Sequence, residues 1–102
     1  MLKHYEISIE KAFQQELFNI LLYIDIALCN KKAAIDLNSA ITKAIAKRSF
    51  FPMAYEPLDT PTLSKPHYRI YVNNYVVYYT TSENEMFIRH IFYAKRDRLK
   101  LL

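Results

Sequence analysis

The sequence predicts an α+β fold in which a helical hairpin covers one face of a small, mainly antiparallel sheet, in the order β-α-α-β-β-β. Apolar residues alternate with polar ones before residue 10, then recur at three- and four-residue steps to about residue 51. Three runs of β-branched and aromatic residues follow between residues 68 and 93. A chain of 102 residues can bury one two-layer core, so we expect a single domain over residues 1–102.

The first half reads as one strand followed by two helices. Tyr5, Ile7 and Ile9 alternate with polar neighbours, as in a half-buried strand. The first helical stripe is made of Phe13, Leu17, Ile20, Leu21, Ile24 and Leu28. Asn30 is placed to cap the second helix through its side-chain oxygen, and Pro52 is expected to end it near residue 51. The short connection makes the two helices antiparallel and keeps them in contact.

The second half reads as a linker and three strands. Residues 52–66 hold all four prolines and suggest an extended crossing of the kind that often carries function. The pair Asn73-Asn74 and the segment 82–85 are turn candidates between strands. The middle strand is apolar on both faces, which is typical of a central strand. We expect the sheet face opposite the helices to be left open, with exposed aromatic side chains forming a docking surface.

Composition excludes several classes of function. The chain has no glycine, which excludes the Gly-rich loops that cradle phosphates. No apolar run approaches the ~20 residues that cross a bilayer, and no secretion signal is seen, so we expect a cytoplasmic protein. One cysteine, Cys29, cannot form an internal disulfide. Because His4, His67 and His90 are far apart in sequence, we expect no metal site, and we expect no organic cofactor.

The positive charge is concentrated at one end of the chain. Residues 1–88 carry nine cationic and nine acidic side chains. In residues 89–102 five cations face Asp97 alone, which leaves a charge of +4; these cations are Arg89, Lys95, Arg96, Arg98 and Lys100. Such a segment favours an anionic partner, although it would also suit a solvated tail.

Three segments, taken in order, resemble the RelE/ParE superfamily of bacterial toxins. They are Tyr68-Arg69 at the start of the second strand, residues 74–79 with the sequence Asn-Tyr-Val-Val-Tyr-Tyr, and residues 89–97 with the sequence Arg-His-Ile-Phe-Tyr-Ala-Lys-Arg-Asp. The resemblance covers nearly the whole chain and includes Ala33-Ala34 at the start of the second helix. It implies the toxin of a type II toxin–antitoxin pair, neutralised by a small antitoxin protein in a hetero-oligomer.

The superfamily divides into two activities, and this sequence is closer to one of them. RelE-like members cut mRNA on the ribosome, whereas ParE-like members poison DNA gyrase and are not known as nucleases. Val76 stands where RelE-like nucleases carry an arginine on the third strand, and valine cannot stabilise phosphate charge. The chain also ends without the terminal tyrosine of those nucleases. The ParE-like, non-enzymatic reading is therefore favoured; the alternatives are a RelE-like mRNA endoribonuclease and a degenerate toxin that only binds its antitoxin.

Two overlapping sets of residues are candidates for function. A nuclease would draw its base, acid and phosphate contacts from His67, Arg69, His90, Tyr93 and Arg96. Contacts with the antitoxin or the target would come from Arg69, Arg89, Tyr93, Lys95, Arg96 and Arg98. A purely structural alternative pairs Arg69 and Arg89 with a glutamate such as Glu6 or Glu85 and leaves both histidines as sheet-surface residues.

Overall fold

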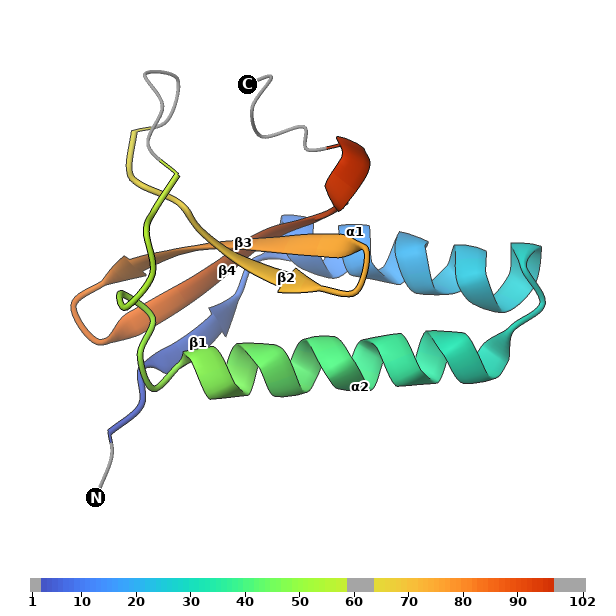
Figure 1. Ribbon diagram of the computed structural model, residues 1–102, viewed down its shortest axis with the longest axis horizontal. Helices are drawn as coiled ribbons and strands as arrows, with labels where there is room; N and C mark the ends of the chain where they lie inside the picture. The colour runs from blue at the N-terminus through green and yellow to red at the C-terminus, as the bar shows by residue number, and fades with distance from the viewer. Residues whose placement is uncertain (1–2, 59–63, 97–102) are drawn as a thin grey trace.

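The computed structural model describes residues 3–58 and 64–96, and it has the predicted α+β order (Figure 1). The elements are β1 (Glu6–Ile9), α1 (Lys11–Leu22), the π-helical turn η1 (Tyr23–Ala27), α2 (Lys31–Arg48), β2 (Tyr68–Val72), β3 (Tyr75–Ser82), β4 (Glu85–Tyr93) and the 3-10 turn η2 (Ala94–Arg96). The predicted first helix is thus α1 continued by η1, and the second ends three residues earlier than expected.

The sheet has the strand order β1-β4-β3-β2. β4–β3 and β3–β2 pair antiparallel, whereas β1 pairs parallel with β4, so the first strand of the chain lies beside the last. Both helices pack on the same face of the sheet, α1 against β4 and α2 against β2 (Figure 1). β3 is a central strand, as its two apolar faces predicted.

Local sequence signals account for the helix boundaries and the turns. The Asn30 side-chain oxygen accepts a hydrogen bond from the Ala33 N–H at 3.1 Å, which confirms the predicted cap. Both tight turns contain a residue with positive φ, Asn73 between β2 and β3 and Glu83 between β3 and β4. Glutamate rarely adopts this conformation, but the chain has no glycine to supply it.

A hydrogen-bonded node fixes the exit of α2 to the sheet. The fully buried Tyr79 hydroxyl donates to the Pro52 carbonyl oxygen at 2.6 Å. Arg48 Nη1 lies 3.1 Å from the same hydroxyl and donates to the Arg69 carbonyl oxygen at 2.9 Å. The Arg48 guanidinium also lies 3.7 Å from the centre of the Tyr55 ring, a cation–π contact. The proline-rich segment therefore starts from an anchored position.

The expectation of an open sheet face opposite the helices is wrong at its centre. Val76 and Tyr78 on that face have no exposed surface, and Leu58 and Phe92 pack against them. Leu58 belongs to the proline-rich segment, and its backbone N–H and C=O both pair with His67. Leu58 thus covers the centre of this face, where the apolar residues of a central strand need burial on both sides. Tyr71 at the β2 edge stays 62% exposed.

Exposed apolar side chains are found mainly on the helices and their flanking segments instead. In Figure 1 the end of the hairpin formed by η1 and the start of α2 extends beyond the β2–β3 turn and has no sheet beneath it. Ile26 on η1 and Ile35 on α2 are 64% and 61% exposed, and Leu22, Tyr23 and Leu28 are exposed as well.

No helix in the described ranges has the length and apolar character needed to span a membrane.

The two isoleucines on α2 provide a test of where the core lies. Ile41 is 1% exposed and sits in the helix–sheet core, so Ile41→Ala should lower the free energy of unfolding by about 2–5 kcal/mol through an unfilled cavity. Ile35→Ala removes the same atoms from an exposed site and should change the free energy of unfolding by less than about 0.5 kcal/mol. Urea unfolding of both variants measures the difference, and equal losses would contradict this core.

Candidate functional site

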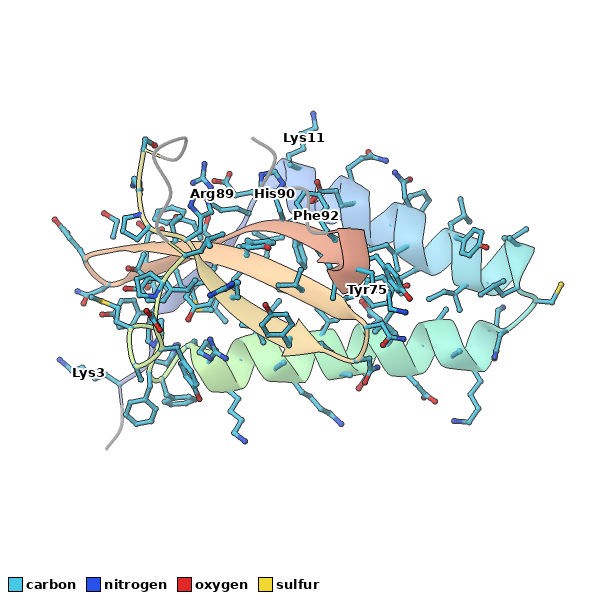
Figure 2. The ribbon with its side chains drawn as sticks, turned by 45° about the horizontal axis from the view of Figure 1, so that its top comes forward. Lys3, Lys11, Tyr75, Arg89, His90 and Phe92 are labelled. Atoms are coloured by element: carbon cyan, nitrogen blue, oxygen red, sulfur yellow. The ribbon has the colours of Figure 1, made fainter. Side chains whose placement is uncertain are left out.

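The edge of β4 becomes irregular where β1 ends. Ile9 is the last residue of β1 to pair with β4, opposite Ile88, and β4 continues alone on that side to Tyr93. On the other side Tyr79 pairs with Ile88 and Tyr78 with His90, so one β4 residue, Arg89, is left between them as a bulge. A bulge interrupts the regular alternation of side chains along a strand, and here it falls at Arg89, next to His90 (Figure 2).

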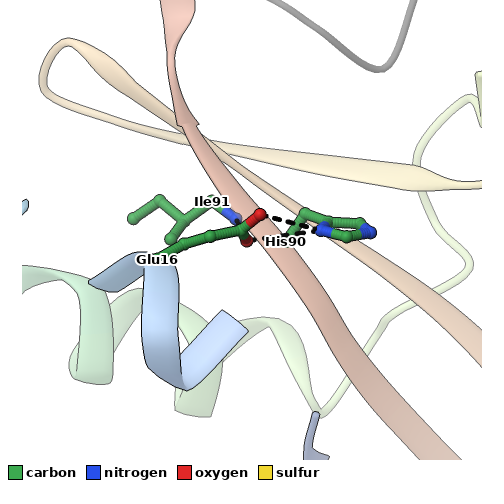
Figure 3. A network of polar contacts seen from close by, with 3 residues as sticks. All are labelled: Glu16, His90 and Ile91. Atoms are coloured by element: carbon green, nitrogen blue, oxygen red, sulfur yellow. Dashed lines mark hydrogen bonds and ion pairs between the residues drawn. The ribbon is translucent and has the colours of Figure 1, made fainter. Parts of the chain in front are cut away.

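Two glutamates, neither of which the sequence analysis singled out, hold this irregular edge. Arg89 Nη1 forms an ion pair with Glu10 Oε1 at 3.3 Å, so its partner is Glu10 and not Glu6 or Glu85. Glu16 on α1 accepts a hydrogen bond from the Ile91 N–H at 3.1 Å, and its other oxygen lies 3.1 Å from His90 Nδ1 (Figure 3). Because the partner is a carboxylate, Nδ1 of His90 must be the protonated nitrogen.

His67 lies just before β2, on the opposite edge of the sheet from β1, and its charge environment includes Arg89 and His90. It is 7% exposed, and its Nδ1 lies 3.0 Å from the Lys65 carbonyl oxygen, which requires a proton on Nδ1. Burial lowers the pKa of His67; the hydrogen bond to Lys65 opposes this, and the charges of Arg89, His90 and Lys65 lower the pKa further. The ring is therefore neutral near pH 7, with Nε2 as its acceptor nitrogen.

Arg69 completes what we call the outer cluster, defined as His67, Arg69, Arg89 and His90. Arg69 pairs with Tyr78 across β2–β3, and Tyr78 pairs in turn with His90, so Arg69 and His90 lie in one row. Arg69 is half-buried and forms no ion pair with any other described residue. The structure thus brings together four residues that the sequence proposed from two separate strands.

The other proposed residues lie elsewhere. The Tyr93 ring packs edge-on against Tyr75, with ring centroids 5.7 Å apart, whereas the His90 ring stacks on Phe92 at 5.4 Å. Lys95 is exposed in η2. The Arg96 side chain and the whole of Arg98 lie outside the described residues, so of the cations in the predicted segment 89–102 only the Arg89 and Lys95 side chains are seen.

The contacts restrict what the outer cluster can do. Two of its four side chains, Arg89 and His90, are engaged by carboxylates of the chain itself, and His67 is buried. Arg69 is the member best able to meet an anion. Within residues 3–58 and 64–96, no three His, Cys, Asp or Glu side chains are grouped so as to hold a metal ion. The cluster is thus mainly neutralised from within the chain.

A second candidate is a groove between the two helices and β1, which we call the apolar groove. It has a volume of about 500 Å³ and is lined by Ile7, Ile9, Phe13, Gln14, Leu17, Phe18, Leu21, Ile41, Thr42, Ile45 and Ala46. Phe18 on α1 is 59% exposed, and Ile7 and Ile9 are both 39% exposed. A groove of this composition beside an edge strand suits an apolar helix face or an extended segment of another protein.

No family model matches the chain, and no curated protein matches it.

The buried histidine makes the stability of the fold depend on pH. Because the folded-state pKa of His67 lies below its ordinary value, the unfolded chain binds more protons at low pH, and stability should fall as the pH drops through about 6.5. In His67→Gln the fall between about pH 7.5 and 5 should be smaller. Urea unfolding at several pH values measures the free energy of unfolding, and His4→Gln is the control, because His4 is exposed. An unchanged pH profile in His67→Gln would contradict the assignment.

Proposed function

We propose that this chain is the ParE-like toxin of a type II toxin–antitoxin pair. It acts in the cytoplasm without a metal or organic cofactor, arrests growth by binding a macromolecular target, and is neutralised by a cognate antitoxin. DNA gyrase, the target of ParE-like toxins, is the target we propose. The helical hairpin on one face of a four-stranded sheet agrees with the fold that the resemblance implies.

The observation that carries the proposal is the apolar surface of the helical hairpin. The apolar groove and the projecting end of the hairpin expose Phe18, Ile26 and Ile35 to more than half of their full extent. An exposed apolar surface of this kind marks contact with another protein. An antitoxin segment with an apolar face would fill the groove, and acidic residues on it would meet the cationic end of the toxin.

The outer cluster favours a second function, ribosome-dependent mRNA cleavage. The neutral His67, with Nε2 as its acceptor nitrogen, has the protonation state of a general base, and Arg69 would contact phosphate. Two features weigh against it. Val76, in the position of the nuclease arginine, is fully buried, and Arg89 and His90 already have carboxylate partners. A toxin that retains only antitoxin binding is the third possibility.

Induction of the chain alone separates these functions. We expect early loss of DNA synthesis with an SOS response. Co-expression of a cognate antitoxin should relieve both effects. Rates of DNA and protein synthesis are measured by pulse labelling, and new mRNA ends by primer extension. Prompt loss of translation with new 5′ ends would replace the gyrase proposal with mRNA cleavage, and normal growth would leave antitoxin binding alone.

The cationic end is tested by a charge-matched pair of double variants. Lys95→Ala with Arg96→Ala should lower toxicity and leave the free energy of unfolding within about 0.5 kcal/mol, because Lys95 is exposed in η2. Lys31→Ala with Lys32→Ala removes the same charge from two exposed positions at the start of α2 and should leave toxicity unchanged. Full toxicity of the Lys95/Arg96 variant would refute a role for this end in target binding.

A further inference from the structure

A second hollow lies on the opposite side of α1 from the apolar groove. It has a volume of about 730 Å³, within the range of ordinary ligand sites, and opens at the edge of β4 beyond the end of β1. We call it the tyrosine hollow, after Tyr23, Tyr75 and Tyr93 in its wall. Figure 2 shows Tyr75 towards the end of the sheet from which the helices project.

The three tyrosines come from three different elements. Tyr23 is the first residue of η1, Tyr75 the first of β3 and Tyr93 the last of β4. The Tyr75 and Tyr93 rings lie edge-on with their centroids 5.7 Å apart, and Tyr23 lines the same hollow. Burial raises the pKa of Tyr75, and the nearby Tyr93 and Tyr23 raise it further. The Leu28 N–H bonds to the Tyr23 carbonyl oxygen at 3.1 Å, five residues back, as expected of the π-helical turn. Such turns are frequent at functional sites.

The only formally charged side chain among the described residues that line the hollow is the carboxylate of Glu16. It is fixed in position by the Ile91 N–H and by His90 Nδ1 (Figure 3). A carboxylate has about four lone-pair sites, so these two donors leave room for another. Asn19 adds an amide beside it. A pre-positioned negative charge among aromatic rings attracts a cation, and no cationic lining residue is described that would serve an anion.

We propose that the tyrosine hollow binds an organic cation, an ammonium or guanidinium head group that lies against the tyrosine rings and pairs with the Glu16 carboxylate. The volume admits a whole lysine or arginine side chain of a partner protein, and equally a small free amine. The inference does not depend on the toxin proposal. It assigns Tyr93 a role in a different site from the outer cluster.

The test is an NMR titration of the ¹⁵N-labelled full chain. The probes are N-acetyl-arginine amide, N-acetyl-lysine amide and choline. Two of them are compared with a neutral analogue, N-acetyl-citrulline amide for arginine and 3,3-dimethyl-1-butanol for choline. We expect saturable shifts of the Asn19, Ile91 and Tyr93 amides with the cations and none with the neutral analogues. Saturation by the amino-acid amides alone indicates a protein side chain as the natural ligand, and tighter binding of choline indicates a small free ammonium compound.

Substitution of Tyr23 locates the binding. Tyr23 is 60% exposed, so Tyr23→Leu should fold normally and weaken binding by about two- to fivefold, while Tyr23→Phe keeps the π face and should bind as before. Tyr71→Leu is the matched control, because Tyr71 is as exposed and lies on β2, at the opposite edge of the sheet. Unchanged binding in Tyr23→Leu, equal binding of the neutral analogues, or no shift with any cation would overturn the proposal.

Discussion

The open edge of β4 beyond Ile88 is the constraint on which the rest of the arrangement depends. β1 stops there, and a strand edge facing α1 needs partners for its buried N–H and C=O groups. The Glu10 N–H bonds to the Ile88 carbonyl oxygen at 2.9 Å, and Glu16 accepts from the Ile91 N–H one helical turn and a half later. Together they align α1 along this edge. The apolar groove then forms on one side of α1 and the tyrosine hollow on the other.

The charged outer cluster is largely paired within the chain, whereas the exposed apolar surface of the hairpin is not covered by any described residue. This difference supports a protein partner for the hairpin. The partly exposed Arg89–Glu10 pair adds little stability, but it neutralises a cation of the outer cluster. The exposed apolar side chains of the hairpin have no corresponding cover within the described parts of the chain. Burying apolar surface yields about 25 cal/mol per Å² removed from water, so the hairpin is where a partner would gain most.

The hydrophobic periodicity and the turn-forming residues were enough to predict the helices and strands, because these elements depend on residues close together in sequence. Asn30 as a cap and the turn at Asn73 followed from local preference, whereas the positive φ of Glu83 did not. Contacts between distant residues were not predicted. Leu58 over Tyr78 and Glu16 at Ile91 each join positions far apart in sequence, and one sequence does not specify such pairs. Glu16 gave one usable signal: it follows Phe13 by three residues and precedes Ile20 by four, so it borders the apolar stripe.

The parallel pairing of Glu6 with Glu85 has a consequence for synthesis of the chain. A nascent polypeptide can close the helical hairpin and the β2–β3 turn early, since both are local. β4 is the last of the four strands to leave the ribosomal exit tunnel, yet it must insert between β1 and β3 to complete the sheet. Before that insertion, β1 has no neighbour to hold it against the groove, and the hollow lacks one wall. Neither surface can engage a ligand until β4 has left the ribosome and joined the sheet.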